Sequence, residues 1–140
     1  MKSFMKLFLV LIFGLIVAPG SYAQDKEMKS NDKKDQVSWE DAKEAYHEIM
    51  SSTFHPAEEG DFKPLKERYQ ELAMRAKDWR AVAIPDDLAD KDLDKILEKL
   101  HKKSSKVGEL IVAGASDEDL KKSIFALHDV FHKIVGLCSH

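Results

Sequence analysis

The chain has 140 residues, with 22 Lys and Arg against 25 Asp and Glu, and a formal charge of −3 at pH 7. This balance argues against a nucleic-acid-binding protein, which would favour a strongly basic face. The single cysteine excludes an internal disulfide, so the packing of one core must hold a domain of this size.

The first 23 residues have the pattern of an export signal. Met1 to Lys6 is short and basic, residues 7–18 are almost wholly apolar, and Ser21 and Ala23 fit the small-residue pattern before a cleavage site. The apolar run of about twelve residues is short for a membrane span, which needs roughly 20. We therefore expect cleavage after Ala23 and a periplasmic or secreted protein that does not span the membrane.

Residues 24–37 are expected to form a disordered leader, because they are charged and polar without apolar periodicity. Residues 38–140 then make up the predicted folded domain. Once Lys2 and Lys6 are removed with the signal, the mature chain keeps 20 basic and 25 acidic residues, a formal charge of −5.

The first helix is predicted from about Trp39 to Phe54. Ser38 and the acidic side chain of Asp41 have the spacing of a capping box, which satisfies free backbone N–H groups at a helix start. Pro56 disfavours helical geometry at the residue before it and is expected to end the helix at His55. The apolar positions repeat at three and four residues and so share one face: Trp39, Ala42, Tyr46, Ile49, Met50 and Thr53.

Three more helices follow. Pro64 suits the first turn of the second, which ends near Trp79 or Ala83. The break at 84–87 precedes a third helix over about 91–112, and a second capping-box pattern at 116–119 opens the last, which continues to about Leu137. Four amphipathic helices with short connections predict an all-α fold, an antiparallel up-down-up-down four-helix bundle. The expected inward positions of helices two and three are Leu65, Tyr69, Leu72, Ala73, Ala76, Leu93, Ile96, Leu97, Leu100, Val107, Leu110 and Ile111.

Three histidines are predicted to converge between the first and last helices. At about 100° per residue, His128 and His132 lie on one flank of the last helix, and His47 lies on the flank of like sense on the first. In antiparallel neighbours these flanks face each other, and a level alignment of the helix ends sets His47 opposite His128. An i, i+4 histidine pair with a third imidazole is a common site for Zn, Cu or Fe. Met50, Glu44 or water could supply a fourth ligand.

His55 and Cys138 are auxiliary candidates for the metal site. His55 points away from the core and could join only if the chain folds back at Pro56. Cys138 falls in the apolar stripe of the last helix, where a small buried hydrophobe is the default reading. A soft-metal ligand shared with His140 and an intermolecular disulfide are the next alternatives. The competing interpretation of all the histidines is that they are boundary residues bonded to water or carboxylates.

The stretch Ile124-Phe125-Ala126-Leu127-His128-Asp129-Val130-Phe131 resembles the last helix of the cytochrome c-prime superfamily and its b-type relatives. The resemblance implies a four-helix bundle with His128 as axial haem ligand. Ile124 and Leu127 stand where the haem-linking cysteines of Cys-x-x-Cys-His would be, so covalent attachment at this motif is excluded. The b-type relatives imply non-covalent haem b held by Met50 and His128.

These observations predict an exported four-helix bundle that binds a transition-metal ion for metal handling or sensing. The alternatives are a cytochrome-like electron carrier with non-covalent haem, and a ligand-free structural or interaction bundle. An enzyme is not expected, because the sequence has no nucleophile beside a base, no glycine-rich phosphate loop and no evident carboxylate pair. The protein partner is not indicated, and a homodimer stays open.

Overall fold

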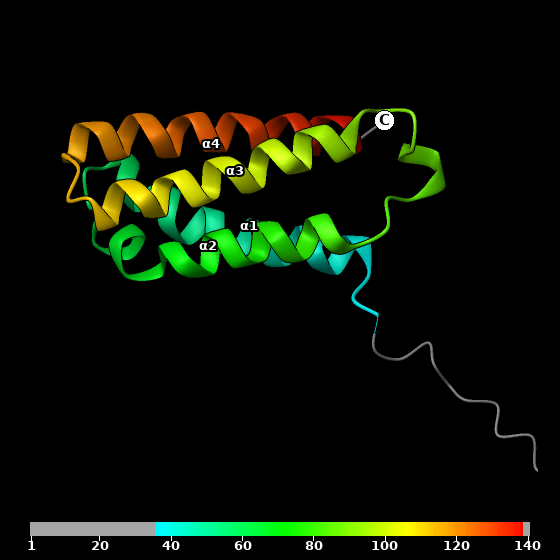
Figure 1. The fold of residues 1–140 in the computed structure, drawn as a ribbon, viewed down its shortest axis with the longest axis horizontal. Coiled ribbons are helices and arrows are strands. Elements are labelled where there is room, and N and C mark those ends of the chain that lie inside the picture. The colour runs from blue at the N-terminus through cyan, green and yellow to red at the C-terminus, as the bar shows by residue number, and fades with distance from the viewer. Residues whose placement is uncertain (1–35, 139–140) are drawn as a thin grey trace, which may run out of the picture. The chain divides into compact units, whose positions relative to one another are not determined.

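The fold is known from a computed structural model that describes residues 36–138. The predicted signal peptide with its cleavage site, residues 24–35 of the predicted leader, and His140 lie outside the described residues. The described part contains α1 (Trp39–Glu58), α2 (Lys63–Ala81), α3 (Leu93–Val112) and α4 (Asp117–Cys138), with a short 3₁₀ helix at Asp86–Leu88 (Figure 1). No strand occurs among these residues, so the all-α prediction is confirmed.

Each helix packs against the next helix in the chain, and α1 also packs against α4. Figure 1 shows α3 and α4 along one side and α1 and α2 along the other. The contact between α1 and α4 is the least extensive of the four. This packing agrees with a four-helix bundle. None of the helices in the described part of the chain is long and apolar enough to cross a membrane.

The helix starts follow from local chemistry. Ser38 Oγ accepts the Asp41 N–H at 3.1 Å, and Asp41 Oδ2 accepts the Ser38 N–H at 3.3 Å, so the predicted capping box is present. Ser116 Oγ accepts the Asp119 N–H at 3.2 Å in the same way at the start of α4. Pro64 lies in the first turn of α2, as predicted.

Pro56 does not end α1, which corrects the predicted boundary at His55. The helix continues to Glu58 with Pro56 inside it. Proline lacks an N–H and strains an interior turn, but only one turn remains here. The Pro56 carbonyl accepts the Asp61 N–H at 2.9 Å, and Ala57 is fully buried. These contacts hold the last turn together.

An aromatic cluster forms the centre of the core. Tyr46 of α1 lies between Trp79 of α2 and Phe131 of α4, with ring centroids 5.8 and 5.5 Å away. Its buried hydroxyl is 3.0 Å from Ser104 Oγ of α3, so Tyr46 contacts all three other helices. The predicted stripe of α1 is buried throughout, whereas Tyr69 of α2 is only half-buried.

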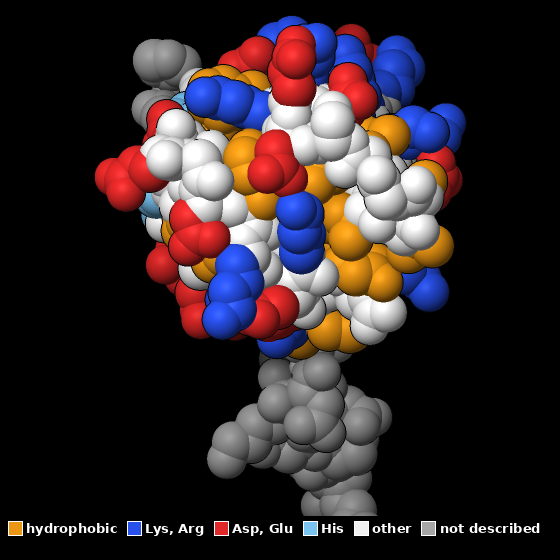
Figure 2. All heavy atoms as spheres, turned by 90° about the vertical axis from the view of Figure 1, so that its left-hand side faces the viewer, with side chains coloured by type: hydrophobic (Ala, Val, Ile, Leu, Met, Phe, Trp, Pro, Cys, Tyr) orange, Lys and Arg blue, Asp and Glu red, His pale blue; other side chains and the backbone are white. Residues whose placement is uncertain are grey.

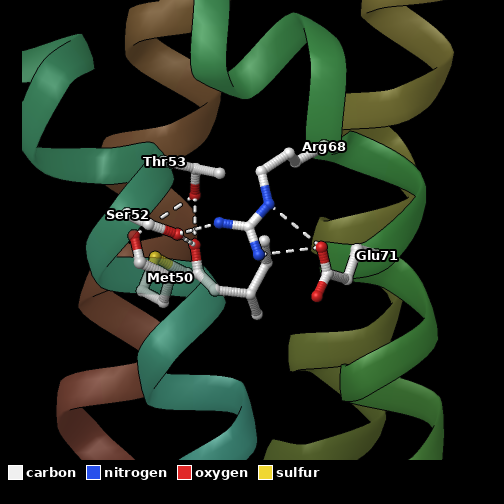
Figure 3. A network of polar contacts seen from close by, with 6 residues as sticks. Met50, Ser52, Thr53, Arg68 and Glu71 are labelled. Atoms are coloured by element: carbon white, nitrogen blue, oxygen red, sulfur yellow. Dashed lines mark hydrogen bonds and ion pairs between the residues drawn. The ribbon is translucent and has the colours of Figure 1, made fainter.

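A polar network joins α1 to α2 beside the core (Figure 3). Arg68 Nη1 donates to Ser52 Oγ at 2.7 Å, and the same guanidinium pairs with Glu71 Oε2 at 2.9 Å. The Thr53 hydroxyl donates to the Ile49 carbonyl at 2.7 Å, within its own helix. These bonds fix the middle of α1.

The end of the bundle that carries the α1–α2 and α3–α4 connections shows acidic and basic side chains interspersed, with no field of one sign (Figure 2). Lys66 of α2 and Asp117 of α4 form an ion pair of 2.7 Å there. Because both partners are exposed, this pair contributes about 0–1 kcal/mol.

Candidate functional site

A cavity of about 350 Å³ lies between α1 and α4. This volume is at the lower end of the range of small-ligand sites, about 300–1,000 Å³. Apolar side chains make much of its wall, and four of the five histidines among residues 36–138 line it. Its residues are Lys43, Glu44, His47, Met50, Ser51, Phe54, His55, His128, Phe131, His132 and Val135.

His128 and His132 are the two lining histidines in direct contact. They stand one turn apart on α4, and their Nε2 atoms are 3.1 Å apart. Two nitrogens bound to one tetrahedral metal at about 2.0–2.1 Å lie roughly 3.3 Å apart. The pair is therefore close to the spacing that chelation of a single ion requires. Without an ion, one Nε2–H can donate to the other nitrogen.

Phe54 provides the surface on which His128 lies. The two rings are stacked with centroids 3.7 Å apart and planes 4° from parallel. Desolvation against this wall, with the neighbouring charge of His132, lowers the pKa of His128 below its usual 6.5. His128 is therefore mostly neutral at pH 7, which is the form that binds a metal.

The level alignment of the helix ends predicted His47 directly opposite His128, but the structure places another ring there. His47 stacks on Phe131 with a centroid distance of 5.6 Å and an angle of 14°, while Phe54 occupies the place on His128. Relative to the predicted register, these two contacts displace α1 along α4 by three to seven residues, or about one to two turns. The packing of large rings sets this register, and the helix ends do not.

His55 lines the same cavity without any fold-back of the chain, because α1 continues past Pro56. Its Nδ1 is 2.9 Å from Glu58 Oε2 one turn further on. The expected route to the site, a loop beginning at Pro56, is therefore wrong. His55 reaches the cavity as part of a continuous helix.

The remaining predicted residues divide between the cavity and the core. Met50 is buried and lines the cavity, as required of it under the haem alternative, and Glu44 lies at the rim. Cys138 is outside the cavity and packs, half-buried, against the core. Burial raises the pKa of its thiol.

Across residues 36–138, no three or more His, Cys, Asp or Glu side chains are placed close enough together to hold a metal ion as they stand. The structure brings together the α4 pair, and a third ligand would have to turn toward it. Sequence reasoning missed the contributions of Phe54, Ser51 and Glu58. The sequence did carry a signal for Glu58, because it stands three residues after His55, a spacing at which side chains on a helix can pair.

The arrangement defines the class of this protein only coarsely, as a four-helix protein with a histidine-lined apolar cavity. Comparison of the chain with protein-family models, with curated proteins and with solved structures found no match.

Proposed function

We propose that this protein is a four-helix bundle that binds a transition-metal ion, with His128 and His132 as the primary ligands. The observation that carries the proposal is the 3.1 Å separation of their Nε2 atoms at the wall of a cavity. The lowered pKa of His128 supports it, because a neutral imidazole binds metal without first losing a proton. A role in metal handling or sensing after export fits the signal-like N-terminal sequence.

We further infer that consecutive helices of the bundle run in opposite directions. Trp39 at the start of α1 packs on Trp79 at the end of α2, with ring centroids 5.4 Å apart. Lys91, just before α3, donates to the Leu137 carbonyl near the end of α4 at 2.6 Å. The colour gradients of the ribbons in Figure 1 also support alternating directions. In this topology α1 and α4 are antiparallel neighbours that flank the cavity.

The test compares metal binding by untagged protein with that of His128→Ala/His132→Ala. The matched control is His101→Ala, since His101 lies on α3 and does not line the cavity. Calorimetric titration with Zn²⁺ or Cu²⁺ should give one tight site in the unaltered protein and in the control. The double variant should lose that site. Equal binding by all three proteins would refute the proposal.

Non-covalent haem is a second candidate, because Met50 and His128 line the same cavity and much of its wall is apolar. The resemblance of the stretch at 124–131 to the cytochrome c-prime superfamily favours it independently. Haemin added to the protein should then give a sharp Soret band that His128→Ala and Met50→Ala both alter. Absence of such a band would exclude this candidate and leave the metal-ion proposal standing.

A further inference from the structure

We propose that His55 is the third protein ligand of the metal site and that Glu58 is its positioning residue. The site would then take a borderline divalent ion, such as Zn²⁺, Cu²⁺, Ni²⁺ or Co²⁺, on three imidazole nitrogens. This inference rests on the proposed function. It replaces His47, the third ligand favoured by the sequence.

His55 follows His47 and Ser51 at steps of four residues, so the three share one flank of α1 and all line the cavity. Because the helix continues through Pro56, His55 stays on the flank of α1 that borders the cavity. It is also close to the α4 pair. Desolvation is the main cause of the lowered pKa of His128; the charge of His55 adds a little to that lowering, and the charge of Glu58 opposes it. All three groups therefore lie within electrostatic reach of one another.

The bond to Glu58 prepares His55 for coordination. A carboxylate accepts only, so Nδ1 must carry the proton in the 2.9 Å contact with Glu58 Oε2. In the neutral ring the lone pair is then on Nε2, the nitrogen left free for a metal. A carboxylate behind the imidazole is the usual outer partner of a metal-bound histidine, because it fixes the tautomer and raises the ligand's basicity. No hydrogen bond of this kind fixes the tautomer of His47 within residues 36–138.

The site closes if the His55 side chain turns toward the α4 pair, since no three His, Cys, Asp or Glu side chains in residues 36–138 are close enough as they stand. The His55 side chain is 65% exposed, so little packing resists its turning toward α4. Phe54 contacts both neighbours, edge-on to His55 at 5.6 Å and stacked on His128 at 3.7 Å, and it forms a common wall for the two imidazoles. Three nitrogens leave the fourth tetrahedral position free for water or a small exogenous ligand at the cavity.

The experiment titrates Co²⁺ into the untagged full chain and records Cu²⁺ electron paramagnetic resonance spectra of the same variants. His55→Ala should weaken Co²⁺ binding by about tenfold or more and remove one nitrogen from the Cu²⁺ spectrum. Glu58→Ala should weaken binding by about tenfold, and by no more than His55→Ala does. Glu58→Gln should lose less, because its amide oxygen still accepts the Nδ1–H bond. His47→Ala and His101→Ala serve as matched controls and should bind as the unaltered protein does.

The outcomes separate this inference from the proposed function. If His55→Ala and Glu58→Ala bind like His101→Ala while His128→Ala/His132→Ala loses the ion, the role of His55 is refuted and the metal site stands. If His47→Ala alone removes the third nitrogen, the inference is also refuted. If the unaltered protein binds no more tightly than the double variant, the proposed function itself fails.

Discussion

Removing either partner of the buried hydrogen bond between Tyr46 and Ser104 should lower the unfolding free energy, but by unequal amounts. The Ser104 hydroxyl donates to the Leu100 carbonyl at 2.9 Å, so the Tyr46 hydroxyl must donate to Ser104 Oγ at 3.0 Å. Tyr46→Phe removes one hydrogen bond and leaves Ser104 satisfied, which should cost about 1 kcal/mol of unfolding free energy. Ser104→Ala leaves a fully buried hydroxyl on Tyr46 without a partner, at a cost of about 1–3 kcal/mol.

The double variant tests whether the unpaired Tyr46 hydroxyl causes the larger loss of stability. Tyr46→Phe/Ser104→Ala has no unsatisfied hydroxyl and should be more stable than Ser104→Ala alone, although it lacks one more polar group. Urea unfolding measures all four proteins. A difference of about 2 kcal/mol moves the midpoint by roughly 1 M when the slope is about 2 kcal/mol/M. If the two single costs simply add in the double variant, the proposed asymmetry is wrong.

Three further predictions concern backbone and charge. Gly108→Ala places a Cβ 2.8 Å from the Tyr69 ring and should lower the unfolding free energy by about 1–3 kcal/mol. Gly136→Ala adds a Cβ with nothing within 4 Å and should raise the unfolding free energy by about 0.5–1 kcal/mol. Urea midpoints that moved in the same direction for both variants would contradict this. Pro56→Ala restores an N–H inside α1 and should raise helicity and the unfolding free energy by about 1 kcal/mol, as circular dichroism during urea unfolding would measure. Because the pKa of His128 is lower in the folded state, the unfolded state binds more protons below pH 6.5. The unfolding free energy of the metal-free protein should therefore fall as the pH drops from 6.5 through the folded pKa, and His128→Gln should flatten that slope.

The helices could be predicted because their signals are local. The capping box at Ser38, proline in the first turn of α2 and apolar spacing each act within a few residues, and the structure contains all of them. The end of α1 was not predictable in the same way. The preference against helix before Pro56 is real, but burial of Ala57 and the bond from the Asp61 N–H outweigh it. Tertiary contacts decided that boundary.

The site was predicted in its membership more closely than in its geometry. The positions on the helix flanks grouped His47, His128 and His132, which line one cavity, but placed the fourth lining histidine, His55, away from the core. They could not set the register between the helices, which depends on how Phe54 and Phe131 pack against imidazole rings. His47 and His55 stand eight residues apart on α1, roughly two turns, and both line the cavity, so the register decides which of them is nearer the α4 pair. Which of them completes a site is therefore a property of packing.

The sparse contact between α1 and α4 has a consequence for the order of unfolding. The most extensive contacts of the described helices are between chain neighbours, and the direct contact between the first and last helices is the smallest of the four main pairs. Contacts between chain neighbours favour rapid folding. The limited contact between α1 and α4 favours early separation of these two helices during unfolding. An ion held by His55 and the α4 pair would tie α1 to α4 across the whole domain, much as a cross-link closes a long loop. Removal of the metal should then loosen the contact between α1 and α4, measurable as faster amide exchange along both helices when chelator is added.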